Sequence, residues 1–174
     1  MKYFVVVSYD DDAERKRVDY LLSKWAERAD VEKPRGMTFI IETEQEKEFF
    51  EELFSRIEGN PSEKVRIYRV TEEWPELRER SATREYLLAE EEGFVRRFLA
   101  YLCSKLGGTF SPGEETCEVY TRKGRGVIQF SLRGTPRGTV VRVTVSGYGE
   151  VVEYLLSRVD EELKPLAGDS YGTL

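Results

Sequence analysis

Two short glycine-bearing turns in the second half of the chain constrain its fold more than any other feature. They separate three runs rich in β-branched and aromatic residues: CEVYTR (117–122), GVIQFSLR (126–133) and TVVRVTV (139–145). The first connection is KGR (123–125) and the second is GTPRG (134–138). Connections this short join neighbouring strands as antiparallel hairpins. The sequence therefore predicts an antiparallel sheet in this part of the chain.

Helical periodicity flanks these strands on both sides. Apolar residues recur at three- and four-residue steps over residues 84–106, and glycines end that helix at Gly107. A second amphipathic helix follows Gly147 and is expected to end at Pro165. The prediction for this half of the chain is a linker at 73–83, an α-β-β-β-α unit with an antiparallel sheet at 84–165, and a disordered tail at 166–174.

The first part of the chain alternates between strand-like and helical periods. The runs 2–9, 37–42 and 64–70 are apolar, β-branched and aromatic, which is typical of buried strands. Two amphipathic stretches lie between them. This order, βαβ(β)αβ, predicts a ferredoxin-like α/β unit at residues 1–72. The whole chain is therefore expected to be an α+β protein.

Scarce residue types limit the chemistry that the chain can perform. It contains no histidine and two cysteines, Cys103 and Cys117, which lie 14 positions apart. Serine–histidine and cysteine–histidine catalytic sites are therefore excluded, and we predict neither a disulfide framework nor a structural zinc site. The glycine turns do not have the spacing of a phosphate-binding loop, so no cofactor is expected.

Composition also bears on the partners and the environment of the chain. The net charge of −6 argues against a uniformly basic nucleic-acid binder. Amide side chains are scarce beside abundant Glu and Arg, a bias typical of thermophiles. No apolar run is long enough to span a membrane, and the first residues do not have the pattern of a signal peptide. We therefore expect a cytoplasmic protein with no membrane partner.

Three consecutive aspartates, Asp10, Asp11 and Asp12, follow the first apolar run. Asp11 and Glu14 have the spacing of a helix capping box, and acidic residues in a first helical turn suit the helix dipole. Capping accounts for Asp11 or Asp12 and leaves Asp10 unassigned. A carboxylate at the end of a strand is also a place where Mg²⁺ can be held. Asp10 is therefore the candidate metal ligand.

The run VVVS before Tyr9 and Asp10, the amphipathic helix after it, the Glu-rich helix and KVRIYRV (64–70) together resemble the Cas2 family of CRISPR-associated proteins. The resemblance covers residues 1–72 and implies a ferredoxin-like fold. It also implies either a dimeric, Mg²⁺-dependent nuclease with Asp10 as metal ligand, or a non-catalytic scaffold for the integrase that acquires spacers. Two features depart from the family: one central strand fits before the second helix where the family has two, and residues 73–174 have no counterpart.

The hairpin region is locally basic inside an acidic chain. Residues 117–145 carry six lysines and arginines against one glutamate. Strand alternation places a tyrosine and several arginines on the face opposite the apolar one. Such a face can bind RNA, single-stranded DNA or another polyanion, or it can be solvated or docked against the acidic first half. The candidate binding residues are Tyr120, Arg122, Lys123, Arg125, Arg133 and Arg142.

These features lead to three hypotheses about function. The preferred one is a non-catalytic binding or assembly protein, whose basic face contacts a nucleic acid or an acidic protein and whose first half forms a homodimer. The second is a Mg²⁺-dependent phosphodiesterase or nuclease of the Cas2 type that uses Asp10. The third is a structural subunit that makes protein–protein contacts alone.

Overall fold

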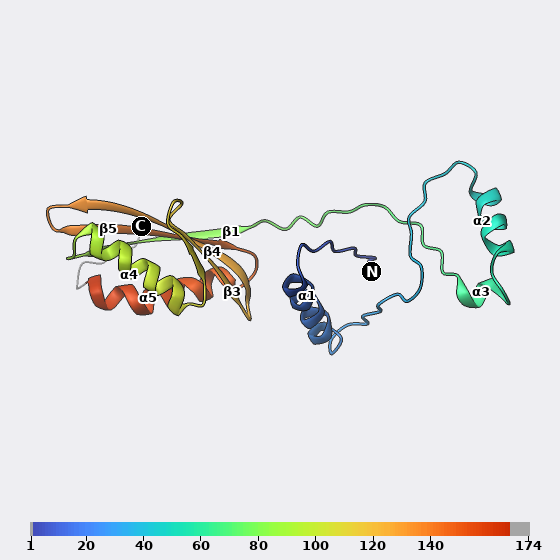
Figure 1. Cartoon of the computed structure of the whole chain (residues 1–174), viewed down its shortest axis with the longest axis horizontal. Coiled ribbons are helices and arrows are strands. Elements are labelled where there is room, and N and C mark those ends of the chain that lie inside the picture. The colour runs from blue at the N-terminus through green and yellow to red at the C-terminus, as the bar shows by residue number, and fades with distance from the viewer. Residues whose placement is uncertain (1, 168–174) are drawn as a thin grey trace. The chain divides into compact units, whose positions relative to one another are not determined.

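The computed structural model describes residues 2–167 of the chain, which divides into two units, Met1–Glu73 and Trp74–Leu174. Each unit has its own helices (Figure 1). The predicted disordered tail lies outside the described residues except for Leu166 and Ala167, which are helical. No helix within the described range is long and apolar enough to cross a membrane.

The second unit is a five-stranded antiparallel sheet with two helices (Figure 1). The strands lie in the order β1-β5-β4-β3-β2. The predicted α+β class and antiparallel sheet are therefore confirmed. In chain order the elements are β1 (Arg80–Leu88), α4 (Glu92–Lys105), β2 (Thr109–Ser111), β3 (Thr116–Thr121), β4 (Gly124–Thr135), β5 (Gly138–Gly147) and α5 (Val151–Ala167).

The two predicted hairpins form the centre of this sheet. β3 and β4 pair up to the turn where Thr121 lies opposite Gly124, and β4 and β5 pair up to the turn where Thr135 lies opposite Gly138. Gly124 and Gly138 have φ angles of +130° and +124°. Residues with a side chain rarely adopt these angles, so glycine is required at both turns.

Gly138 also lies too close to β1 to carry a side chain. A Cβ atom at this position would overlap the carbonyl oxygen of Leu88 and would lie 2.8 Å from the Cα atom of Ala89. We expect Gly138→Ala to lower the free energy of unfolding by about 2 kcal/mol or more, because both the positive φ and the overlap require the backbone to move. Urea denaturation of the two proteins measures this difference.

Gly134 in the same hairpin provides a matched control. A Cβ atom there would meet one neighbour, the Glu92 carboxylate, at 4.0 Å, and the backbone does not have a positive φ. Gly134→Ala is therefore expected to change the free energy of unfolding by less than about 1 kcal/mol. Equal losses for the two alanine variants would contradict the turn geometry.

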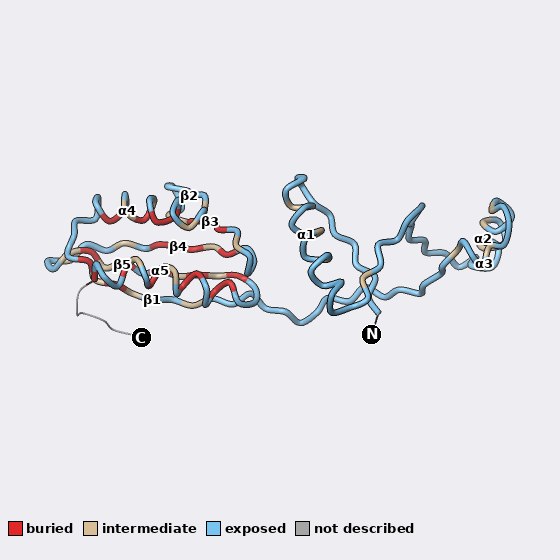
Figure 2. The backbone as a smooth tube through the Cα atoms, turned by 90° about the horizontal axis from the view of Figure 1, so that it is seen from below, coloured by how far each residue is buried: buried red, intermediate tan, exposed pale blue. Residues whose placement is uncertain are grey.

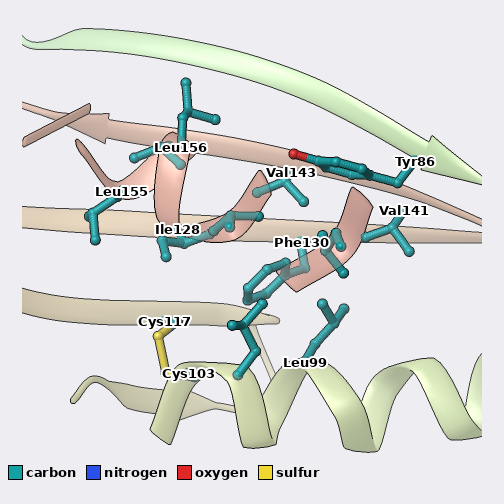
Figure 3. Packing of buried hydrophobic residues seen from close by; sticks show 14 of the residues in the cluster. Tyr86, Leu99, Cys103, Cys117, Ile128, Phe130, Val141, Val143, Leu155 and Leu156 are labelled. Atoms are coloured by element: carbon teal, nitrogen blue, oxygen red, sulfur yellow. A yellow bond between two sulfur atoms is a disulfide. The ribbon is translucent and has the colours of Figure 1, made fainter. Parts of the chain in front are cut away.

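Helices α4 and α5 lie against the same face of the sheet, and the buried residues lie between them and the strands (Figures 1 and 2). Alternate residues of the strands point into this layer, as Figure 3 shows for Ile128, Phe130, Val141 and Val143. Each large side chain buried there contributes about 1.5–3 kcal/mol. The helices contribute Val95, Leu99, Leu102, Val151, Val152, Leu155, Leu156, Val159 and Leu163 to the same core.

The long helix predicted over residues 84–106 is wrong in its first part. β1 runs to Leu88, and α4 begins at Glu92 after a turn. Tyr86 and Leu88 are buried while Leu87 between them is half-buried, which is the alternation of a strand. A short apolar run fits both periods, and pairing with β5 decides the outcome here. The unit is therefore β-α-β-β-β-β-α and not α-β-β-β-α.

The helix ends were predicted with mixed success. The end of the first helix is confirmed, because α4 stops at Lys105 and Gly107 adopts a φ of +74°. The predicted end of the last helix at Pro165 is wrong, because α5 continues through this residue to Ala167.

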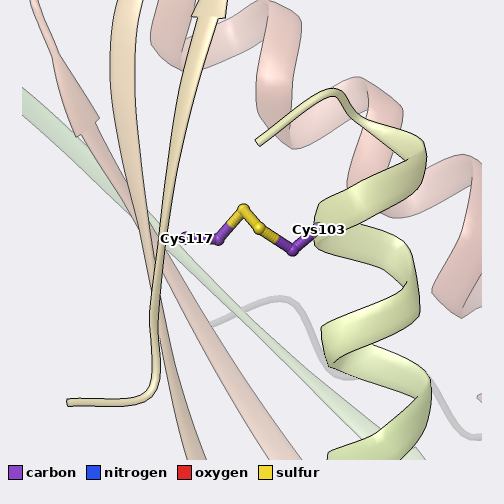
Figure 4. Close-up of a disulfide and its surroundings, with 2 residues drawn as sticks. All are labelled: Cys103 and Cys117. Carbon is purple, nitrogen blue, oxygen red and sulfur yellow. A yellow bond between two sulfur atoms is a disulfide. The ribbon is translucent and has the colours of Figure 1, made fainter. Parts of the chain in front are cut away.

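A disulfide joins Cys103 of α4 to Cys117 of β3, which corrects the prediction that no disulfide forms (Figures 3 and 4). Both cysteines are fully buried, and their Cα atoms are 5.8 Å apart. This separation is within the range that a disulfide spans. The bond fixes the C-terminal part of α4 against the sheet.

The first unit contains three helices and, within residues 2–73, no strand (Figure 1). They are α1 (Asp12–Trp25), α2 (Glu46–Ser55) and α3 (Pro61–Lys64). The segments 2–9, 37–42 and 64–70, predicted as strands, do not pair with one another, and α3 includes the first residue of the last segment. The ferredoxin-like arrangement predicted for residues 1–72 is therefore absent from the described structure.

Strand-type residues remain exposed in this unit. None of residues 2–73 is buried (Figure 2), and Val5, Val6 and Ile40 each expose more than 70% of their surface. One local contact joins the second segment to α2, where the rings of Phe39 and Phe49 meet edge to face with centroids 6.0 Å apart. Strand propensity shows that a segment fits a sheet, but a strand forms only where another strand pairs with it.

Candidate binding face of the sheet

Within residues 74–167, no helix covers the face of the sheet turned away from α4 and α5, which is the open face of the sheet. Its residues are those that alternate with the buried ones and pair across the strands. They are Ser81, Thr83, Glu85, Leu87, Thr116, Glu118, Tyr120, Arg125, Val127, Gln129, Ser131, Arg133, Val140, Arg142, Thr144 and Ser146.

A row of hydrogen-bonding side chains crosses the middle of the open face. Thr83, Thr144, Gln129 and Thr116 lie opposite one another on β1, β5, β4 and β3. The hydroxyl oxygens of Thr83 and Thr144 are 2.9 Å apart and share a hydrogen bond. Hydroxyl and amide groups both donate and accept, so this row can meet either kind of polar group on a ligand.

The arginines of the open face are partly balanced by glutamates. Glu85 lies directly opposite Arg142, and its carboxylate accepts a hydrogen bond from the Arg142 guanidinium at 2.6 Å. Arg125 pairs with Glu118 on the neighbouring strand. The hydrogen bond that Arg125 donates to the Glu118 carboxylate is the main cause that raises the pKa of Arg125. The two glutamates leave one excess positive charge among the three arginines of this face.

Arg133 accounts for that excess charge. It is exposed and forms no ion pair with any residue in the described range. Arg133 lies opposite Val140, two positions along β5 from Arg142. Diagonal neighbours on a sheet are about 7–8 Å apart. Arg133 and Arg142 therefore form a pair of cations close to one end of the open face.

The remaining candidates lie at the opposite end of β4. Tyr120 and Arg125 face each other on the open face, and the Tyr120 hydroxyl donates to Glu118 at 2.9 Å. Arg122 and Lys123 lie in the β3–β4 turn, where the Lys123 ammonium pairs with Glu150 at 2.6 Å. The structure thus places four of the six predicted residues on one face and the other two in a turn at its end.

Residues of β1 on the open face were missed by the sequence analysis. Thr83 and Glu85 take part in two of its rows, yet Thr83 was predicted to lie in the linker at 73–83 and Glu85 in the helix at 84–106. The signal that could have located them is the alternation from Ala82 to Leu88, in which Ala82, Tyr86 and Leu88 point into the core and Arg84 pairs with Asp160 of α5.

The aspartate triplet is divided between capping and ion pairing. Asp11 is the N-cap of α1 and accepts a hydrogen bond from the backbone N–H of Glu14 at 2.7 Å, which confirms the predicted cap. Asp12 pairs with Lys16 at 2.8 Å and with Arg15 at 2.7 Å. Hydrogen bonds from Lys16 and then Arg15 lower the pKa of Asp12.

Asp10 contributes its backbone to the same cap. Its N–H donates to the Glu14 carboxylate at 3.1 Å, while its own carboxylate makes no hydrogen bond or ion pair within the described range. Residues 2–167 hold no group of three or more carboxylate or thiol side chains placed to bind a metal ion. The assignment of Asp10 as a metal ligand stays a prediction.

Comparisons with known proteins add no family to this description. No family model, no curated protein and no solved structure matches the chain. The resemblance of residues 1–72 to the Cas2 family therefore also stays a prediction.

Proposed function

We propose that this chain is a non-catalytic binding protein, and that its open face contacts a single-stranded nucleic acid. One observation carries the proposal: Arg125, Arg133 and Arg142 lie on a sheet face that no helix in the described part of the second unit covers. The Arg142 and Arg125 side chains expose 60% and 58% of their surface. Their glutamate partners hold them in place, and a phosphate can take the place of a carboxylate on a guanidinium.

The shape and the side chains of the open face favour a single strand over a duplex. The open face presents no helix that could enter a groove, whereas single strands lie across sheets and stack bases on aromatic rings. Tyr120 is 49% exposed and offers one such ring beside Arg125. The row of Thr83, Thr144 and Gln129 offers donors and acceptors to the edges of unstacked bases.

Removal of the two adjacent cations tests the proposal. We expect the double variant Arg133→Gln/Arg142→Gln to bind a fluorescent single strand of about 16 nucleotides at least about tenfold more weakly at low salt. The salt dependence should flatten as well. The slope of log K against log salt is negative, and its magnitude should decrease by about 1.4, because each phosphate contact contributes about 0.7. Fluorescence anisotropy over a salt series measures both quantities.

Two arginines of the helical layer provide a matched control. Arg97 of α4 is exposed and Arg158 of α5 is half-buried, and the double variant Arg97→Gln/Arg158→Gln changes the net charge by the same amount. This control should bind as the unaltered chain does. Equal weakening of both double variants would indicate a general charge effect, and absence of binding by the unaltered chain at low salt would contradict the proposal.

One observation favours a second candidate function, a Mg²⁺-dependent phosphodiesterase that uses Asp10. Capping and ion pairing involve the carboxylates of Asp11 and Asp12 and leave that of Asp10 exposed. Mg²⁺ is often held by one or two carboxylates together with water and substrate phosphate, so Asp10 fits as one ligand. If the chain is such an enzyme, we expect it to cleave a labelled single strand only when a divalent cation is present. The Asp10→Asn variant should lose this cleavage while its helix content stays unchanged. Cleavage that persists in Asp10→Asn would exclude it.

A further inference from the structure

The two edges of the five-stranded sheet are unlike. β2 consists of three residues, Thr109–Ser111, whereas β1 consists of nine, Arg80–Leu88. β1 pairs with β5 along its whole length, and no described residue forms a strand on its other side. A strand of this length offers an edge of about 30 Å to which a further strand can add.

β1 lacks two of the features that usually protect an edge strand. It contains no proline, and its register with β5 runs without a bulge. Its inward arginines are turned onto α5, where Arg80 pairs with Glu153 at 2.5 Å and Arg84 pairs with Asp160. Their charges are therefore held over the helix and balanced there. β2 is protected by its shortness, and β1 has no comparable protection.

We propose that β1 pairs antiparallel with β1 of a second copy of this chain around a two-fold axis, which joins two sheets into one. Identical antiparallel strands are related by such an axis, so each copy uses its edge once and the contact does not propagate into a fibre. The contact is independent of any ligand. It would place the open faces of both copies on the same side of the joined sheet.

The charges along α5 favour a second copy over an unrelated strand. The pairs Arg80–Glu153 and Arg84–Asp160 show that α5 runs in the same direction as β1. Along this flank of α5 the acidic Glu153 therefore comes first and the basic Lys164 comes last. A two-fold axis reverses the second copy and brings Lys164 of one copy towards Glu153 of the other. Glu153 is paired with Arg80 and Lys164 with Asp160 in each copy, so at both ends of the contact a balanced ion pair of one copy meets a balanced ion pair of the other.

Proline substitutions at two neighbouring positions of β1 test this pairing. Successive N–H groups of a strand point to opposite sides, so one of Ala82 and Thr83 donates towards β5 and the other towards the free edge. We expect circular dichroism to show that one of Ala82→Pro and Thr83→Pro loses the fold and the other retains it. In sedimentation equilibrium the fold-retaining variant should have a dimer dissociation constant raised at least about tenfold.

Hydrogen exchange on the unaltered chain is a second readout that does not depend on either variant. Half of the β1 amides should exchange more slowly at concentrations where the dimer forms than in dilute solution. The proposal would be overturned by a chain that stays monomeric at high concentration, or by a fold-retaining proline variant that dimerises as well as the unaltered chain. Concentration-dependent protection confined to residues 2–9, 37–42 or 64–70 would also overturn it, by assigning the contact to the first unit.

Discussion

Replacement of Asp160 by alanine is expected to lower the free energy of unfolding by about 3 kcal/mol. Asp160 lies on α5, its side chain is 11% exposed, and it accepts a hydrogen bond from the buried Tyr86 hydroxyl at 2.5 Å. It also pairs with Arg84 and with Lys164. Alanine would leave the Tyr86 hydroxyl without this acceptor in the core and two cations without their counter-charge. The estimate is at the lower end for a buried pair because Arg84 and Lys164 are nearly half-exposed.

Glu161 is the matched control for this substitution. It is the next residue of α5, is exposed, and pairs with Arg158 on the surface of the same helix. Glu161→Ala should change the free energy of unfolding by less than about 0.5 kcal/mol, because exposed ion pairs contribute little. Urea denaturation compares the two variants. Losses of similar size for Asp160→Ala and Glu161→Ala would contradict the role of the buried carboxylate.

Removal of the disulfide is expected to lower the free energy of unfolding by about as much as Asp160→Ala does. The bond between Cys103 and Cys117 closes a loop of 14 positions, for which the chain-entropy account gives about 3 kcal/mol of stabilisation. The double variant Cys103→Ala/Cys117→Ala should unfold at a correspondingly lower urea concentration. Alanine is preferred to serine because both positions are fully buried, and a hydroxyl there would need a hydrogen-bond partner.

Thiol titration provides the control for the disulfide prediction. The unaltered chain, denatured without reductant, should show no free thiol, and both cysteines should react after reduction. Two free thiols before reduction would contradict the bond. Disulfides persist in oxidising compartments and also inside cells of hyperthermophiles. A disulfide inside a hyperthermophile cell is compatible with the amide-poor composition of the chain. The cytoplasmic location and the thermophilic source both stay predictions.

Local signals in the sequence were sufficient to predict the centre of the second unit. The turns at 123–125 and 134–138 specify hairpins by themselves, and the alternation along β4 and β5 assigns their faces. The placement of Arg133 and Arg142 on the open face followed from this alternation alone. The cap at Asp11 was also predicted, because it depends on residues three positions apart.

Features that depend on distant contacts were not predicted. Tyr86 to Leu88 fits a helix or a strand, and pairing with β5, more than 50 residues later, selects the strand. The glutamate that balances Arg142 lies on the same misassigned strand, so the sequence overstated the charge of the open face. Cys103 and Cys117 approach each other only because α4 packs against β3. Spacing along the chain contains none of this information.

Mapping of the contact surface by NMR tests the central claim most directly. A single-stranded oligonucleotide is titrated into the isotope-labelled chain, and backbone amide shifts are followed residue by residue. The proposal expects the largest shifts on the open face, around Arg125, Arg133 and Arg142, with those of α4 and α5 nearly unchanged. Shifts concentrated on the helices or on residues 2–73, or no shifts at low salt, would contradict the assignment of the open face as the binding surface.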